Sequence, residues 1–172
     1  MKTSPRAIEP ACLRSAAMSD GRCRPSSRTA VHDPRWPAIA ERLAAMRERG
    51  RYAVRIVDAD CGAGCLLIHS LHYARSLGFT AIEGRGIDGS PALIGRARAA
   101  AVARRDPAIG VVFEVADMAD ALAEELDCPA DIVLWHGIGQ ARARGDILAT
   151  ISAAGDLVLA DEGLRAVGKL AA

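Results

Sequence analysis

The segment 55–65 constrains the fold of this 172-residue chain more than any other. A mainly apolar run leads to an acidic residue, Asp58, and then to a turn of small residues that contains Gly62 and Gly64. An apolar-periodic segment begins directly afterwards, at Leu66. This order predicts a strand, a tight glycine loop and the start of a helix. In parallel α/β sheets ligands bind where strand ends meet helix starts, so the loop is a candidate ligand site.

Strand-like and helix-like segments alternate through the rest of the chain. Five apolar stretches are typical of strands, at 52–57, 81–88, 111–115, 130–135 and 156–160. Segments with helical spacing or helix-capping residues separate them, at 34–49, 66–77, 91–101, 120–126 and 140–153. This alternation calls for parallel strands joined by right-handed crossovers. We therefore predict an α/β fold, a Rossmann-like three-layer α/β/α sandwich with a mostly parallel sheet of about five strands.

Capping residues predict where several helices begin and end. Asp33 and Pro34 fit the N-cap and first position of one helix, and Ser90 and Pro91 fit those of another. Gly50 is a plausible helix stop because glycine readily adopts a left-handed backbone conformation.

The length of the chain suits one globular domain with a sizeable core. Residues 1–33 contain several Pro, Ser and Thr residues and lack sustained apolar periodicity, which predicts a poorly ordered extension. A short lid helix near 11–18 is the alternative for that segment. We expect residues 34–172 to form the folded, ligand-binding domain.

Composition excludes several classes of protein. A formal net charge of +1 argues against a general nucleic-acid binder. No apolar run approaches the ~18–20 residues of a membrane span, and the N-terminus lacks the apolar core of a secretory signal. The five cysteines form no repeating CxxC pair, as expected of free thiols in a reducing compartment. We expect a soluble, cytoplasmic protein.

An acidic residue ends each of three successive predicted strands. Asp58 precedes the glycine loop, Asp88 ends the second strand, and Asp117 ends the third. Glycines let a ligand approach the backbone, and a carboxylate at the next strand end accepts hydrogen bonds from ribose hydroxyls. Asp117 and Met118 suit an adenine amino group and ring. Each acid alone is more often a cap or turn residue, but together they predict a nucleoside pocket.

Four segments resemble the successive motifs of class I S-adenosylmethionine-dependent methyltransferases, and the resemblance covers roughly 35–165. These segments are 57–64 (VDADCGAG), 86–91 (GIDGSP), 116–118 (ADM) and 131–134 (DIVL). The resemblance implies that the loop faces the methionine moiety, that the second motif holds the ribose and that the third holds the adenine. The cofactor-binding residues it implies are Asp58, Asp60, Cys61, Gly62, Ala63, Gly64, Asp88, Gly89, Ser90, Asp117, Met118 and Trp135.

His136 is the one candidate for a catalytic role. By the same resemblance, it and Trp135 border the methyl group and the acceptor. The unperturbed pKa of a histidine side chain lies near neutral pH, which suits a general base. The alternative is that His136 only makes structural hydrogen bonds in the loop after the strand. Methyl transfer needs mainly an aligned nucleophile, so a dedicated base is not required.

Two departures from the family pattern matter. Asp60 stands where the family usually has glycine, so its carboxylate either binds the cofactor's amino group or caps the following helix. The dozen residues after the fifth strand do not suffice for the family's sixth and seventh strands. The fifth strand would then be an exposed sheet edge, open to a second subunit.

Two rival interpretations are weaker. A nicotinamide-binding loop would carry a third glycine after Gly64, and this chain has none there. Cys65, His69 and His72 share a helical face, as zinc ligands would, but their position opposite the apolar face predicts ordinary exposed residues and no metal.

The sequence therefore predicts an S-adenosylmethionine-dependent methyltransferase that acts on a small-molecule acceptor. The alternative is a non-catalytic binding or assembly protein with an incomplete methyltransferase fold.

Overall fold

The computed structural model describes residues 30–136 and 145–160. Within them, five strands form one sheet in the order β3-β2-β1-β4-β5, and every paired neighbour is parallel. The strands are β1 (Ala53–Asp58), β2 (Ala81–Asp88), β3 (Ile109–Val115), β4 (Ile132–Trp135) and β5 (Val158–Ala160). The predicted α/β fold with a parallel sheet of about five strands is confirmed.

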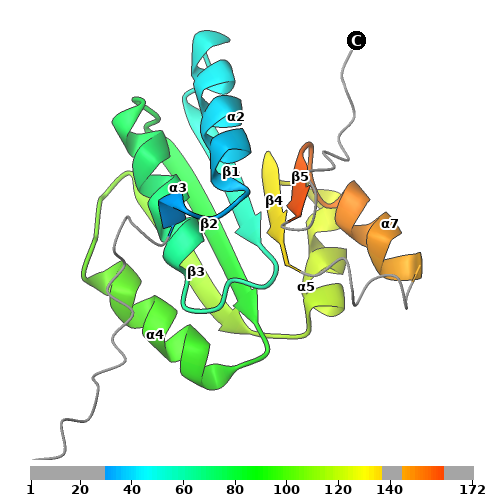
Figure 1. Cartoon of the computed structure of the whole chain (residues 1–172). Coiled ribbons are helices and arrows are strands. Elements are labelled where there is room, and N and C mark those ends of the chain that lie inside the picture. The colour runs from blue at the N-terminus through cyan, green and yellow to red at the C-terminus, as the bar shows by residue number, and fades with distance from the viewer. Residues whose placement is uncertain (1–29, 137–144, 161–172) are drawn as a thin grey trace, which may run out of the picture.

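Helices cover both faces of the sheet, which gives the three predicted layers (Figure 1). One face packs against α2 (Trp36–Glu48), α3 (Cys65–Ser76) and α4 (Pro91–Val102). The other packs against α5 (Met118–Glu124), the 3₁₀ turn η1 (Glu125–Asp127) and α7 (Gly145–Ala153). No helix in the described ranges is long and apolar enough to cross a membrane.

The two-residue period of the strands divides the core into two clusters. In β1, Ile56 packs with the α2, α3 and α4 layer, whereas Val57 packs with the α5 and α7 layer. Because side chains alternate along a strand, Asp58 returns to the face of Ile56. In β4, Leu134 and Trp135 divide in the same way, so His136 continues on the face of Leu134.

Local chemistry explains the helix ends, with one correction. Gly50, at φ +79°, ends α2 with the paired backbone bonds of a Schellman motif, as predicted. Ser90 caps α4, also as predicted, because its hydroxyl oxygen accepts from the Leu93 N–H at 3.4 Å. The predicted start of the first helix was wrong, because α2 begins at Trp36. The Asp33 carboxylate accepts instead from the Arg35 N–H at 3.0 Å and binds the guanidinium of the same residue.

Other boundaries shift by a few residues. β3 begins two residues earlier than predicted, and α5 begins at Met118 because Asp117 accepts the N–H groups of Ala119 and Asp120. Most of the predicted extension, including the segment 11–18, and the first residues of the predicted helix 140–153 lie outside the described residues. Ala30 is buried within the first core cluster.

A buried carboxylate joins the sheet to η1, and apolar periodicity gave no sign of it. Glu125 is 1% exposed and pairs with Arg55 and with Arg85, whose Nη1 lies 2.7 Å from its Oε1. Arg85 also pairs with Glu114 and Glu124. Although burial opposes the charge of Arg85, these carboxylates outweigh it and raise its pKa. The charge of Glu125 is therefore compensated from two neighbouring strands.

We predict that Gly86→Ala lowers the free energy of unfolding by about 1–3 kcal/mol, because overpacking a filled core costs about that much. A Cβ at this position in β2 would lie 2.4 Å from the Phe113 ring and 3.0 Å from the Cys61 sulfur. Chemical denaturation measures the change.

The matched control is Gly95→Ala on the exposed side of α4, where a Cβ meets nothing within 4 Å. There we expect a gain of about 0.5–1 kcal/mol, the helix propensity difference between alanine and glycine. Equal effects of the two substitutions would contradict the packing at Gly86.

Candidate functional site

The site lies where the chain reverses direction across the sheet. From β1 the chain proceeds to β2 and β3 on one side, and it returns to β4 and β5 on the other. In open α/β sheets this switch point leaves a crevice at the carboxyl ends of the central strands. The predicted glycine loop, residues 59–64, occupies that position between β1 and α3.

Backbone bonds hold the loop against the end of β2. The Cys61 N–H donates to the Ile87 carbonyl at 2.9 Å, and the Gly62 N–H donates to Asp88 Oδ2 at 3.0 Å. Gly62 and Gly64 have φ values of +54° and +74°, which side chains with a Cβ rarely adopt. The two glycines that the sequence singled out are therefore required by the shape of the loop.

Asp58 is the most unusual group of the site. Its side chain is 1% exposed, and its Oδ1 atom has no hydrogen-bond partner among the described residues. Burial raises the pKa of Asp58 to about 6, although Arg35, His136 and the Asp60 N–H act in the opposite direction. A buried acceptor without a donor is costly, so this oxygen is suited to a ligand that donates hydrogen bonds or carries positive charge.

Arg35 forms the wall next to Asp58, and it is completely buried. Its Nε and Nη2 atoms donate to the Asp33 carboxylate at 2.9 and 2.8 Å, and Nη1 donates to the Trp135 carbonyl at 3.2 Å. Nη2 also lies 2.5 Å from His136 Nε2. Burial opposes ionisation of Asp33, but the bonds from Arg35 outweigh it and lower the pKa of Asp33.

The contact with Arg35 engages one ring nitrogen of His136. A guanidinium only donates, so Nε2 is the acceptor in this contact. A base role at that nitrogen would require this contact to open. His136 as a general base stays a prediction.

These side chains surround a cavity of about 130 Å³. The residues that line it are Ala30, Asp33, Arg35, Asp58, Cys61, Ala63, Cys65, Leu66 and His136. Asp33 and Arg35 were not predicted as site residues. Asp33 is held by Arg35. The other partners of Arg35, Trp135 and His136, lie about a hundred positions away, so local patterning gives no signal for those contacts.

Asp88 ends β2 beside the glycine loop, and Asp60 lies within that loop. The two Asp88 oxygens accept from the N–H groups of Gly62 and Ser90, at 3.0 and 2.7 Å. Burial raises the pKa of Asp60, His136 opposes that shift, and the neighbouring Asp88 carboxylate adds to it. The alternative that Asp60 caps the helix is wrong, because Gly64 is the N-cap of α3 and no side-chain capping bond is made there.

Cys61 lies in the loop, but its thiol is buried. Burial and the neighbouring carboxylates of Asp58 and Asp88 raise its pKa. The sulfur therefore remains protonated at neutral pH, and the residue acts as a small packing element rather than as a reactive thiolate.

The remaining predicted residues occupy different surroundings. Asp117 is exposed and caps α5, while Met118 is half-buried against the second core. The Trp135 side chain packs into that same core, on the face opposite Asp58, so only its carbonyl reaches the cavity wall. A Cβ on Gly89 would meet nothing within 4 Å. The structure thus brings the loop, Asp58 and Asp88 together and leaves Trp135 apart.

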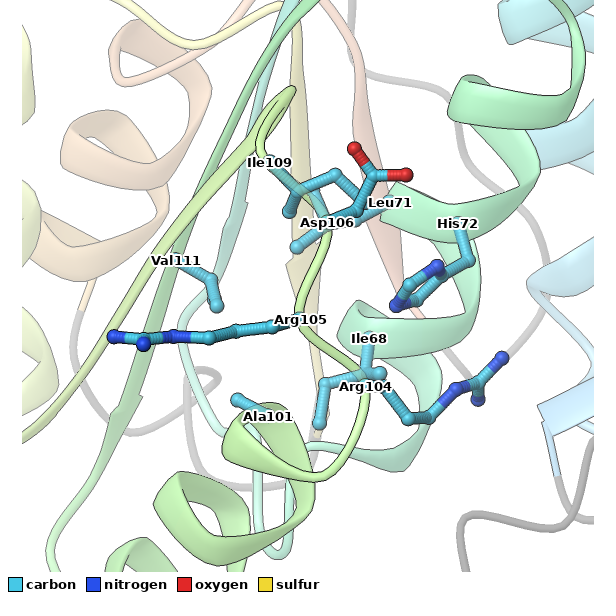
Figure 2. Close-up of a pocket in the computed structure, with 9 residues that line it drawn as sticks. All are labelled: Ile68, Leu71, His72, Ala101, Arg104, Arg105, Asp106, Ile109 and Val111. Atoms are coloured by element: carbon cyan, nitrogen blue, oxygen red, sulfur yellow. The ribbon is translucent and has the colours of Figure 1, made fainter.

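The helical face of Cys65, His69 and His72 is partly buried, not exposed as predicted. The His69 ring lies 4.3 Å from the Trp36 ring, and His72 borders a separate hollow of about 30 Å³ (Figure 2). Figure 2 shows His72 from α3 facing Arg104 and Asp106 from the segment after α4. That space suits a single water and is too small for a nucleoside. In residues 30–136 and 145–160, no group of His, Cys, Asp and Glu could hold a metal ion.

No family model and no curated protein sequence matches the chain. Solved structures do match. The bifunctional kinase-methyltransferase WbdD superposes with a TM-score of 0.53 at 18% identity, over 76% of this chain and 29% of WbdD. Magnesium protoporphyrin IX methyltransferase ChlM from Synechocystis PCC 6803, solved with bound S-adenosylmethionine, gives 0.50 at 19% identity, over 72% of this chain and 56% of ChlM.

The fold is that of class I S-adenosylmethionine-dependent methyltransferases. The predicted resemblance is confirmed at this level, since identities below 20% establish architecture and not activity. The chain spans less than two thirds of the length of either methyltransferase.

We predict that Asp58→Asn changes how stability depends on pH. The pKa of Asp58 in the folded chain, about 6, lies above its ordinary value of 3.8, so folding favours the protonated carboxyl group and the protein loses stability as the pH rises from about 4 through 6. The gap corresponds to about 3 kcal/mol at most. The variant should therefore gain stability relative to the wild type as the pH rises from 4 to 7.5, as measured by chemical denaturation at each pH.

Glu48→Gln, at the exposed far end of α2, is the control and should follow the wild-type curve. Parallel curves for Asp58→Asn and the wild type would contradict the buried, unpartnered state of Asp58.

Proposed function

We propose that the chain binds S-adenosylmethionine at the carboxyl ends of β1 and β2 and transfers its methyl group to a small-molecule acceptor. The observation that carries this proposal is the buried Asp58 oxygen without a donor, on a residue that lines the cavity beside the glycine loop. The α-ammonium group of the cofactor's methionine moiety would supply that donor and a compensating charge.

The other predicted contacts follow from the positions of the strand ends. The loop backbone would lie along the methionine moiety, and Asp88 would accept from the ribose hydroxyls. Its oxygens already accept one N–H each, but each retains a second lone pair. Asp117 and Met118 would border the adenine at the third strand end.

When bound, the cofactor supplies an electrophilic methyl group on a sulfonium. The chain's own residues bind and orient it, and orientation is the main requirement of this reaction. His136 would border the acceptor, with Nε2 available for a proton only after the Arg35 contact opens. A small-molecule acceptor is favoured by the comparison with ChlM, whose name gives magnesium protoporphyrin IX as its substrate.

A non-catalytic binding or assembly role is the second candidate. Two observations favour it: the engaged Nε2 of His136, and the position of β5, which pairs only with β4 within the described residues. An open edge at β5 would suit pairing with a second copy. We propose a cytoplasmic location for either role.

We predict that S-adenosylhomocysteine binds the full chain and that Asp58→Asn and Asp88→Ala each weaken binding about tenfold or more. Each substitution removes a charged hydrogen-bond acceptor, and losing such a bond typically costs 1.5–3 kcal/mol. Isothermal titration calorimetry measures the affinities, with Glu48→Gln as the matched control. Absence of binding by the wild type, or unchanged affinity in Asp88→Ala, would exclude the proposed site.

Transfer of a labelled methyl group separates the two candidates. We expect label to appear in members of a panel of small hydroxyl-, amine- and carboxylate-bearing acceptors, and to disappear with Asp58→Asn. Cofactor binding without transfer to any acceptor, together with a dimeric mass in solution, would favour the assembly role instead.

A further inference from the structure

We infer that Asp60 makes this site discriminate by charge, so that it holds the cationic sulfonium cofactor more tightly than the neutral thioether product. The inference rests on the proposed function and assigns to Asp60 a specificity-determining role that a glycine at this position cannot have.

The first support is the position of Asp60 between the two ligand-facing acids. It lies two residues after Asp58, the last residue of β1, and two residues before Gly62, whose N–H donates to the Asp88 carboxylate at 3.0 Å. The next residue, Cys61, is fixed to the end of β2 by its bond to the Ile87 carbonyl. Asp60 therefore bridges the end of β1 and the end of β2.

The order of groups along the ligand matches this order of residues. In S-adenosylmethionine the sulfur joins the chain that ends in the α-ammonium group to the 5′ carbon of the ribose. If Asp58 receives the ammonium and Asp88 receives the ribose, the sulfur must cross the intervening space. Asp60 lies in the loop between these two acids, so its carboxylate would lie nearest to the sulfonium charge.

The second support is the balance of charge around the loop. Asp58, Asp60 and Asp88 lie close enough for each to act on the ionisation of a neighbour. Burial raises the pKa of Asp58 and of Asp60, and Arg35 and His136 oppose this rise without cancelling it, while Arg35 also forms a salt bridge with Asp33 at 2.8 Å. The negative charge of the three acids is therefore only partly compensated, and a cation between them would lower the repulsion.

Asp58 supplies the independent evidence that a ligand group is missing here. Its Oδ1 atom is buried and has no donor within the described residues, and Asp58 is one of the residues that line the cavity. A cluster of acids at a surface could simply be solvated, but a buried oxygen could not. The cluster continues from this oxygen to the exposed Asp60 carboxyl, which gives the site a cationic preference along its whole length.

Calorimetry on the full chain tests the inference with two ligands that differ by one methyl group and one charge, S-adenosylmethionine and S-adenosylhomocysteine. In the wild type we expect S-adenosylmethionine to bind more tightly. Asp60→Asn, which keeps the shape, and Asp60→Gly, which restores the family's usual residue, should each reduce this preference about three- to tenfold, the effect expected of one partly exposed charge. Raising the salt concentration should reduce the wild-type preference more than that of the variants.

Glu48→Gln is again the control, since it removes one exposed carboxylate about 18 Å from the start of α2 at 1.5 Å per residue. Thermal unfolding of both Asp60 variants checks that they fold. Binding of both ligands with the same preference in the wild type and the two Asp60 variants would overturn the inference and leave the proposed function intact. Binding of neither ligand to the wild type would overturn the proposed function itself.

Discussion

The Phe113 ring is the packing element on which the position of the glycine loop depends. A Cβ on Gly64 would lie 2.8 Å from this ring, and a Cβ on Gly86 would lie 2.4 Å from it. The absence of both Cβ atoms lets β3, β2 and the first turn of α3 close around one aromatic side chain that is 3% exposed. The loop thus packs against a residue of another strand, β3. Its shape therefore depends on core packing as well as on its own glycines.

The sequence predicted well what short-range chemistry decides. Apolar runs located the strands, and Gly50 and Ser90 ended and started helices in the expected way, because each acts through backbone groups a few residues away. The prediction for Asp33 failed for a reason of the same range. Its carboxylate could either cap a helix or bind the Arg35 guanidinium. It binds the guanidinium, because leaving that fully buried charge without a partner would cost more free energy than leaving the helix uncapped.

For the site, the strand-end rule brought the loop and Asp88 together correctly, because parallel strands end at a common edge. It could not show which face a residue takes when both faces are buried. Trp135 and His136 are neighbours in sequence, yet the first packs under α5 and α7 while the second meets Arg35. It also could not show that Arg35 forms the cavity wall, since that depends on a contact between distant segments.

The span of the Arg35 contacts has a consequence for the order in which the molecule assembles. The bonds from Arg35 to Trp135 and His136 close a loop of about a hundred residues, whereas α3 and α4 pack against strands adjacent to them in the chain. Closing long loops is entropically costly and comes late in folding. The β1–β4 pairing closes a loop of comparable length, so we expect this wall of the pocket to form together with the β4 side of the sheet, after β1, β2 and β3 have paired with their local helices.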